Sequence, residues 1–202
     1  RRGAVQVEEP VNLVIDQRRQ HLILAAQDRR NAEIADRLAA SDARLRVVHV
    51  KELPSGWLGK VHAMDRGFRQ ATGEWLLFSD ADVHLDPDLL GRVMTEVLRR
   101  DAEFVTMPPQ LLSSSFLLDA ILASFMRMLV VGGRLWKVSD PKSRVAVGGG
   151  VFNLVKRSAF NKSPGFEWLR MEIADDVSMG QMLKRAGARS EIFDGSSSIR
   201  LH

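Results

Sequence analysis

Short apolar runs alternate along the chain with longer stretches of helical character. Short apolar runs bounded by turn residues are typical of buried strands, and longer stretches with apolar residues on one side are typical of helices. The apolar runs lie at residues 11–15, 22–26, 45–50, 75–78, 104–107 and 145–155. The helical stretches lie at residues 32–40, 60–71, 87–100 and 177–186. This alternation predicts an α/β domain in which helices cover a sheet.

Local chemistry predicts where three of these helices begin or end. Gly73 follows the second helical stretch, where a residue in the left-handed conformation is expected. Asp86 and Pro87 supply an N-cap and a first helical residue for the third stretch. Gly187 follows the fourth stretch and is expected to close it.

The connection between the first two apolar runs is too short for the pattern around it. Only six residues, 16–21, separate the runs, whereas a parallel strand–helix–strand crossover needs about a dozen or more. The runs form a hairpin, or the joining helix is missing, or the stretch is not native in origin, and the sequence leaves all three open. We therefore describe one domain, residues 1–202, with an atypical N-terminal segment at residues 1–31. The sequence begins with Arg1 and shows no signal peptide, so we expect it to be a piece of a longer chain.

Residues 111–131 form a largely apolar segment. Its length matches a membrane span, which needs roughly 20 apolar residues. Asp119 and Arg127 lie inside the segment, and two charges near the middle of a bilayer would cost several kcal/mol. Three interpretations remain open: a helix packed on the domain, a helix lying in a membrane interface, and a true span.

The composition narrows the class of protein. The 202 residues can bury one sizeable core, and 45% hydrophobic with 27% charged residues is a globular balance. The absence of cysteine excludes a disulfide scaffold, a zinc ribbon and a thiol nucleophile. The net charge of +4 suits a polyphosphate, a nucleic acid or an anionic membrane without choosing among them. Nucleic acid is not expected, because Lys and Arg are scattered, Tyr is absent and the aromatic residues lie mostly in apolar runs.

The most informative stretch is an apolar strand that ends in Asp80 and Asp82. Positions i and i+2 of an extended chain point to the same side, so the two carboxylates can converge. In open α/β sheets, ligands bind outside the carboxyl ends of the strands. Hard oxygen ligands in that place suit Mg²⁺ or Mn²⁺, with a phosphate completing the coordination. The alternative is that both aspartates are ordinary turn residues.

A second acidic pair, Asp175 and Asp176, stands at the start of the fourth helical stretch, with Glu172 just ahead. One aspartate suffices to cap a helix, so the pair offers a candidate general base for a hydroxyl. Lys60 opens a helix after a glycine-containing turn, where a lysine and free amides can contact a phosphate. An exposed lysine on a first turn is the simpler explanation of Lys60.

Three consecutive glycines, Gly148, Gly149 and Gly150, stand shortly before Asn153 in an otherwise β-like run. Three bare backbone positions indicate close approach by a ligand or by another segment of the chain. A simple bulge is the competing explanation.

Taken together, residues 54–90 and 172–188 resemble the core of family 2 glycosyltransferases with the GT-A fold. The chain is most similar to the bacterial branch that resembles ceramide glucosyltransferases and hopanoid-associated glycosyltransferases, and the resemblance covers residues 32–202. It implies a Rossmann-like nucleotide-diphospho-sugar transferase fold, with a mixed central sheet flanked by helices and an incomplete N-terminal part. It also implies an inverting transfer of a sugar to a hydroxyl acceptor.

The resemblance assigns roles to particular residues. Asp80 and Asp82 match the DxD motif that holds a divalent cation, Mg²⁺ or Mn²⁺, on the diphosphate of a nucleotide sugar. Lys60 matches the lysine of a GK motif near the nucleotide. Asp176 matches the base that deprotonates the acceptor, and Asp175 occupies the acidic position before it.

The resemblance further implies partners and a location. Gly149, Gly150 and Asn153 fall in the segment that lines the acceptor side. We expect a UDP-sugar donor, a lipid or polyprenoid acceptor, and membrane association at the cytoplasmic face of the cell membrane. The chain departs from its relatives at residues 22–30, where Asp28 alone could correspond to the acidic residues that hold the nucleoside, and it stops before their Gln-x-x-Arg-Trp element.

Two other functions fit parts of the sequence. In a phosphohydrolase of the haloacid dehalogenase type, Asp80 would be the nucleophile and Asp82 the acid/base, but His84 stands where that motif wants Thr or Val. The other alternative is an incomplete module without catalytic activity.

Overall fold

The computed structural model of the chain describes residues 12–16, 21–26, 29–80, 83–109, 115–195 and 198–201. The strands are β1 (Asn12–Asp16), β2 (His21–Ala26), β3 (Leu45–His49), β4 (Trp75–Ser79), β5 (Val83–Leu85), β6 (Phe104–Thr106), β7 (Asn153–Lys156), β8 (Ser190–Ile192) and β9 (Ile199–Leu201). The helices are α1 (Arg29–Ser41), α2 (Gly59–Gln70), α3 (Leu89–Arg100), α4 (Phe116–Gly132), the 3₁₀ turn η1 (Leu135–Lys137), α5 (Arg157–Phe160), α6 (Phe166–Leu169) and α7 (Asp175–Arg185).

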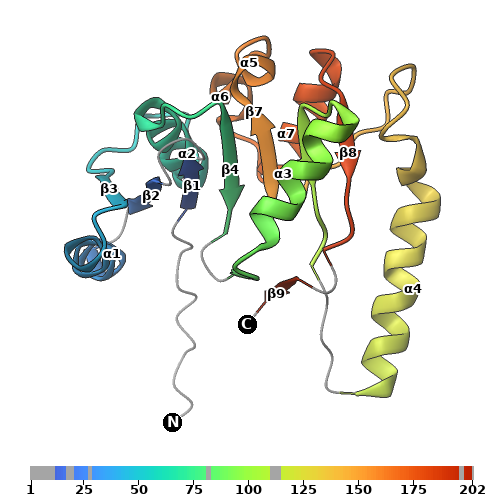
Figure 1. Cartoon of the computed structure of the whole chain (residues 1–202), viewed down its shortest axis with the longest axis horizontal. Helices are drawn as coiled ribbons and strands as arrows, with labels where there is room; N and C mark the ends of the chain where they lie inside the picture. Colours follow the sequence, from blue (N-terminus) through green and yellow to red (C-terminus); the bar gives the residue numbers. More distant parts are fainter. Residues whose placement is uncertain are drawn as a thin grey trace.

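The strands form one mixed sheet in the order β3-β2-β1-β4-β7-β6-β8, and β5 pairs with β9 in a small separate sheet (Figure 1). β1 runs antiparallel to β2 and β4, and β7 runs antiparallel to β4 and β6. β2 is parallel to β3, and β6 is parallel to β8. β2, β3, β4, β6 and β8 therefore share one direction. A mixed central sheet flanked by helices confirms the fold class predicted from the sequence.

The short connection near the N-terminus joins β1 and β2, which form a hairpin. β1 and β2 pair antiparallel, with Asp16 opposite His21. Of the three interpretations of this region, the structure shows the hairpin, because an antiparallel pair needs no crossover helix. α1 then makes the crossover from β2 to its parallel neighbour β3.

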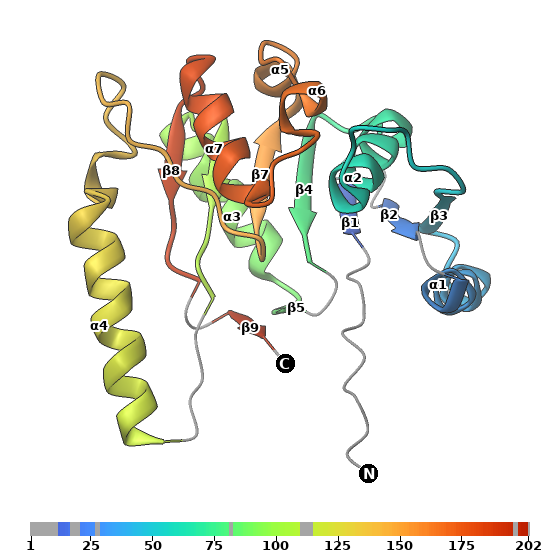
Figure 2. The same ribbon diagram turned by 180° about the vertical axis from the view of Figure 1, so that it is seen from behind.

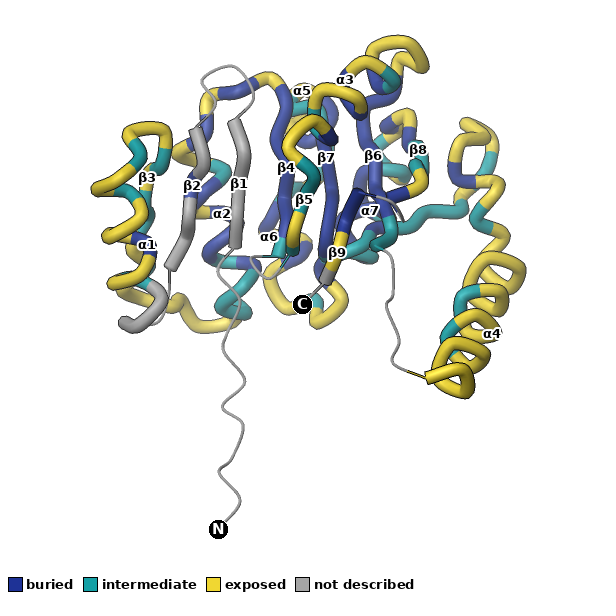
Figure 3. Tube along the Cα trace, turned by 60° about the horizontal axis from the view of Figure 1, so that its bottom comes forward, coloured by how far each residue is buried: buried dark blue, intermediate teal, exposed yellow. Residues whose placement is uncertain are grey.

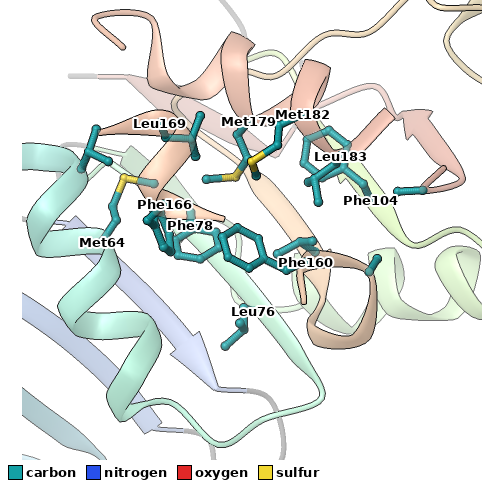
Figure 4. Packing of buried hydrophobic residues seen from close by; sticks show 14 of the residues in the cluster. Met64, Leu76, Phe78, Phe104, Phe160, Phe166, Leu169, Met179, Met182 and Leu183 are labelled. Atoms are coloured by element: carbon teal, nitrogen blue, oxygen red, sulfur yellow. The ribbon is translucent and has the colours of Figure 1, made fainter. Parts of the chain in front are cut away.

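Both faces of β4 are buried, which explains its continuous apolar run. Successive side chains of a strand point to opposite faces. Leu76 and Phe78 pack with residues of α2, α5, α6 and α7 on one face (Figure 4). Figure 2 shows these helices in front of the sheet. Trp75 and Leu77 pack with α3 on the other. Burial of each such side chain stabilises the fold by about 2 kcal/mol, so the strand that carries Asp80 at its end is firmly held between two cores.

Several predicted boundaries are wrong. α2 ends at Gln70 with Ala71 in extended conformation, and Gly73 does not have a positive φ. The buried Ala71 already directs the chain toward β4, so no left-handed cap is needed. α3 begins at Leu89 after Asp88 rather than at Pro87, because the N–H of Leu89 bonds the Asp86 carbonyl in a turn. The prediction at Gly187 is confirmed by its φ of 87°.

The long apolar run at residues 145–155 becomes a strand only over Asn153–Lys156. The residues before it pass instead beside the first turns of α7, where Gly148 touches the backbone of that helix. The segment that leads into β7 therefore has no regular structure and lies against the start of α7.

α4 is the helix found in the segment 111–131, of which residues 111–114 lie outside the described part of the chain. It stands at the edge of the molecule beside β8, and its surface is mostly exposed (Figures 1 and 3). No residue of Phe116–Gly132 is buried, and Phe116 is 89% exposed. The interpretation as a helix packed on the domain is therefore not what the structure shows. No helix in the described ranges has the length and apolar character of a membrane span.

Candidate active site

Asp80 lies directly after β4, at the edge where the parallel strands β4 and β6 end. Its backbone N–H donates a hydrogen bond to the Gly150 carbonyl, 3.1 Å away. The Ser79 hydroxyl donates to the Val151 carbonyl at 2.7 Å. These two bonds fasten the end of β4 to the segment that leads into β7. The glycines and Asp80 are thus held side by side.

Lys60, in the first turn of α2, contacts one aspartate of each acidic pair. Its Nζ lies 3.0 Å from Asp80 Oδ1 and 3.3 Å from Asp175 Oδ1. Asp175 begins α7 and is 5% exposed. Carboxylates that are far apart in the sequence therefore meet at one ammonium group. One aspartate of each acidic pair, Asp80 and Asp175, therefore belongs to the same site.

Burial and neighbouring charge act on the pKa values of this pair in opposite directions. Burial disfavours the charged form of Lys60, but the carboxylates of Asp175 and Asp80 outweigh it and raise the pKa of Lys60 above its usual value. For Asp175, burial raises the pKa of the carboxyl, and the Lys60 charge only partly offsets this. Lys60 thus stays a cation. Its charge favours the ionised form of Asp175, whereas the burial of Asp175 favours the protonated form.

A small cleft lies between these groups. It is lined by Lys60, Met64, Phe78, Ser79, Asp80, Gly150, Asn153, Asp175 and Asp176. Its volume is about 10 Å³, the room that one water or ion needs. Asp176 is half-buried at its rim.

Gly150 must be a glycine for this cleft to exist. A Cβ at this position would lie 2.6 Å from Asp80 Oδ2 and 3.7 Å from Asp176 Oδ2. Any side chain there would displace the Asp80 carboxylate. The bare backbone therefore keeps two carboxylates free to face the same space, and it agrees with the close-approach explanation of the triple glycine.

Gly148 and Gly180 are packed against each other's segments. A Cβ on Gly148 would overlap the Asp176 carbonyl oxygen, and a Cβ on Gly180 would overlap the Val147 carbonyl oxygen. This close contact sets the position of the first turn of α7 and hence of Asp176. Sequence reasoning missed Gly180. A glycine inside a helix costs about 1 kcal/mol relative to alanine, and that cost was the available signal.

We expect Gly148→Ala to lower the melting temperature, because the added methyl group must push the first turn of α7 away. Gly91→Ala on α3 is the control, since a Cβ at that exposed position would meet no atom within 4 Å. Thermal melting of both variants provides the measurement. Equal behaviour of the two variants would contradict the packing argument.

The structure brings most of the predicted site residues together. The cleft gathers Lys60, Asp80, Asp175, Asp176, Gly150 and Asn153. Gly149 lies next to them and donates its N–H to Asn153 Oδ1 at 3.2 Å. Asp82 lies outside the described residues, so its position relative to Asp80 stays a prediction. Within the described ranges, no three His, Asp or Glu side chains are arranged to hold a metal by themselves.

A mixed sheet flanked by helices, with carboxylates and a lysine gathered beyond a strand end, is consistent with a glycosyltransferase domain. The family model described as "Glycosyl transferase family 21" matches residues 16–197, and the chain belongs to this family. No curated protein sequence matches the chain. The predicted resemblance to family 2 glycosyltransferases of the ceramide-glucosyltransferase type is thereby confirmed.

Family membership also decides between the enzyme classes considered above. The chain is a glycosyltransferase, which takes a nucleotide-sugar donor and an acceptor. The phosphohydrolase alternative is set aside, because it assigned the same aspartates to a different class of enzyme.

Proposed function

We propose that the chain transfers a sugar, with inversion at the anomeric carbon, from a UDP-sugar to a hydroxyl group of a lipid or polyprenoid acceptor. The convergence of Asp80, Lys60 and the Asp175–Asp176 pair in one cleft beyond the end of β4 carries this proposal. The cleft combines what such a transfer requires: a cation for the diphosphate and a carboxylate for the acceptor.

The positions of the side chains support the following chemical roles. Asp176 takes the proton of the acceptor hydroxyl while the oxygen of that hydroxyl forms a bond to the anomeric carbon. The bond between that carbon and the diphosphate oxygen breaks, and its electron pair leaves on the nucleoside diphosphate. Lys60 provides a positive charge beside the place where this negative charge develops. Asp175 holds Lys60 in position.

The carboxylates of this site fit a divalent cation. Mg²⁺ and Mn²⁺ are usually held by one or two protein carboxylates together with substrate phosphates. Asp80, at the rim of a cleft with room for one ion, and Asp82 would be the protein ligands. When bound, the cation would neutralise charge on the leaving diphosphate. Two carboxylates suffice for such a site, which is compatible with the lack of a larger ligand cluster among the described residues.

Isothermal titration with UDP-sugars tests the donor site. We expect binding in the presence of Mn²⁺ and much weaker binding in its absence. Asp80→Asn should lose most of the dependence on the metal, because an amide is a weaker ligand than a carboxylate. The control is Asp88→Asn, an exposed aspartate that pairs with Arg92 at 3.2 Å outside the cleft. The absence of metal-dependent heat with every nucleotide sugar would reject donor binding and favour a module without catalytic activity.

The exposed apolar surface of α4 supports the proposed association with a membrane. Its large apolar residues are exposed, among them Phe116 at 89%, Leu117 at 70% and Met128 at 60%. Exposed apolar patches of this kind mark surfaces that bind membranes or proteins. We expect co-sedimentation with anionic vesicles, reduced by Leu117→Asp and unaffected by Glu33→Gln on α1. Equal sedimentation of both variants would contradict a role for α4.

A further inference from the structure

An apolar groove lies between α4 and the body of the domain. Its volume is about 520 Å³, within the range of ligand-binding pockets. Met126, Leu129 and Val130 of α4 form one wall of the groove. Trp136, which lies in η1, also lines it. The groove is therefore a separate space from the small cleft that contains the aspartates.

The two spaces meet at the triple glycine. Gly148 and Gly149 line the groove, whereas Gly150 lines the cleft beside Asp80 and Asp176. Consecutive Cα atoms are about 3.8 Å apart, so the end of the groove lies within a short distance of the proposed base. A molecule lying in the groove can thus extend one end to the cleft.

A buried polar group at that end points to a ligand. Thr106, the last residue of β6, lines the groove and is 3% exposed. Its Oγ1 has no hydrogen-bond partner within the described part of the chain, and it lies 3.4 Å from the place where a Cβ of Gly149 would be. Buried hydroxyl groups without partners are rare because they are costly. A ligand with a polar end near Gly149 would satisfy it.

We propose that this groove binds the acceptor, an amphiphile with one long hydrocarbon chain and a hydroxyl end. The chain lies along Met126, Leu129, Val130 and Trp136, and a polar group near the hydroxyl end hydrogen-bonds Thr106. This inference rests on the proposed function and adds to it the place of the acceptor. The position of the groove next to the cleft, across Gly149 and Gly150, favours a substrate over a second copy of the chain, because a substrate must bring a hydroxyl to Asp176.

Trp136 provides a direct readout of binding that does not depend on activity. A long-chain primary alcohol with bromine atoms along its chain quenches tryptophan fluorescence on contact. We expect saturable quenching of the protein by this alcohol in the absence of donor and metal. Most of the saturable component should disappear in Trp136→Phe, a substitution of a side chain that is 61% exposed. 2-Bromoethanol, which has no chain, should give no saturable quenching.

Two neighbouring positions on α4 give a matched pair of variants. Val130 lines the groove and Val131 does not, and both are substantially exposed, at 42% and 58%. Val130→Asp should weaken binding of the alcohol about tenfold, because an unpaired charge in an apolar site is costly. The affinity of the Val131→Asp variant for the alcohol should be within about twofold of that of the original chain, as expected for a surface change. Thr106→Val should weaken binding of the corresponding brominated 1,2-diol, whose second hydroxyl can hydrogen-bond Thr106. It should not lower the melting temperature, since the Thr106 hydroxyl has no partner to lose in the described part of the chain.

Each outcome decides the proposal. No saturable quenching, or equal affinities of the Val130→Asp and Val131→Asp variants, overturns it. A dimer in analytical ultracentrifugation that dissociates on Val130→Asp, together with no quenching, shows a second copy in the groove and also overturns it. Quenching that follows the expected order supports the groove as a site for a chain-bearing alcohol. If no sugar is then transferred to any such alcohol, the proposed function fails while the binding site stands.

Discussion

Asp176→Asn is expected to lower the rate of sugar transfer about 10²- to 10⁴-fold, the contribution typical of a general base. The amide has nearly the size of the carboxylate but cannot take a proton from the acceptor. Asp176 makes no ion pair with Lys60, which contacts Asp80 and Asp175 instead. Donor binding, measured by titration calorimetry, should therefore remain close to that of the original chain.

Glu172→Gln is the matched control for this substitution. Glu172 also lies near the start of α7, but its carboxylate accepts a hydrogen bond from the Ser178 hydroxyl at 2.9 Å and does not line the cleft. This variant should retain transfer within a few-fold. If Asp176→Asn loses donor binding and transfer to the same extent, Asp176 is a donor ligand and the assignment as base is wrong.

The sheet and its central strand could be predicted because the evidence for them is local. The run at residues 75–78 is apolar at successive positions, which requires burial on both faces. The glycines that bend the chain are also local signals where φ is positive, as at Gly187. Gly73 shows the limit of this reasoning, since a glycine after a helix need not be its cap when the chain continues straight into a strand.

The exposure of α4 could not be predicted. An apolar sequence indicates that a helix is stabilised by removal from water, but it does not indicate which surface covers the helix. Apolar residues occur all around Phe116–Gly132, so the pattern does not define one buried stripe. The structure leaves this surface uncovered by the rest of the described chain. The sequence therefore left a helix packed on the domain open as one of three interpretations, and the structure does not show it.

The candidate site could be predicted as a set of residues but not as a geometry. Asp80 and Asp175 each follow from a local motif at a strand end or a helix start. Their meeting at Lys60 depends on the position of α7, which the contact of Gly148 and Gly180 sets through backbone atoms. Contacts of this kind carry no periodicity in the sequence. Short elements such as α5 and β8 were missed for the same reason.

Lys60→Met is expected to destabilise the fold by about 2 kcal/mol, between the values typical of exposed and of buried ion pairs. The substitution keeps the length of the side chain and removes the one charge that contacts both Asp80 and Asp175. Lys162→Met, at an exposed position, is the control and should change stability by less than about 0.5 kcal/mol. Urea denaturation of the three proteins measures the difference.

The loss of stability in Lys60→Met should depend on pH in a defined direction. Burial already raises the pKa of Asp175 above its ordinary value of 3.8, and the Lys60 charge lowers it. Without Lys60 the pKa of Asp175 rises further, so the folded state binds a proton at pH values where the unfolded state does not. The stability of the Lys60→Met variant therefore falls as the pH rises from 3.8, the ordinary pKa of Asp175, to the raised pKa of Asp175 in the folded variant. The deficit should accordingly be largest near neutral pH and shrink toward about pH 4, and a deficit that stays constant over this range would contradict the coupling of Lys60 to Asp175.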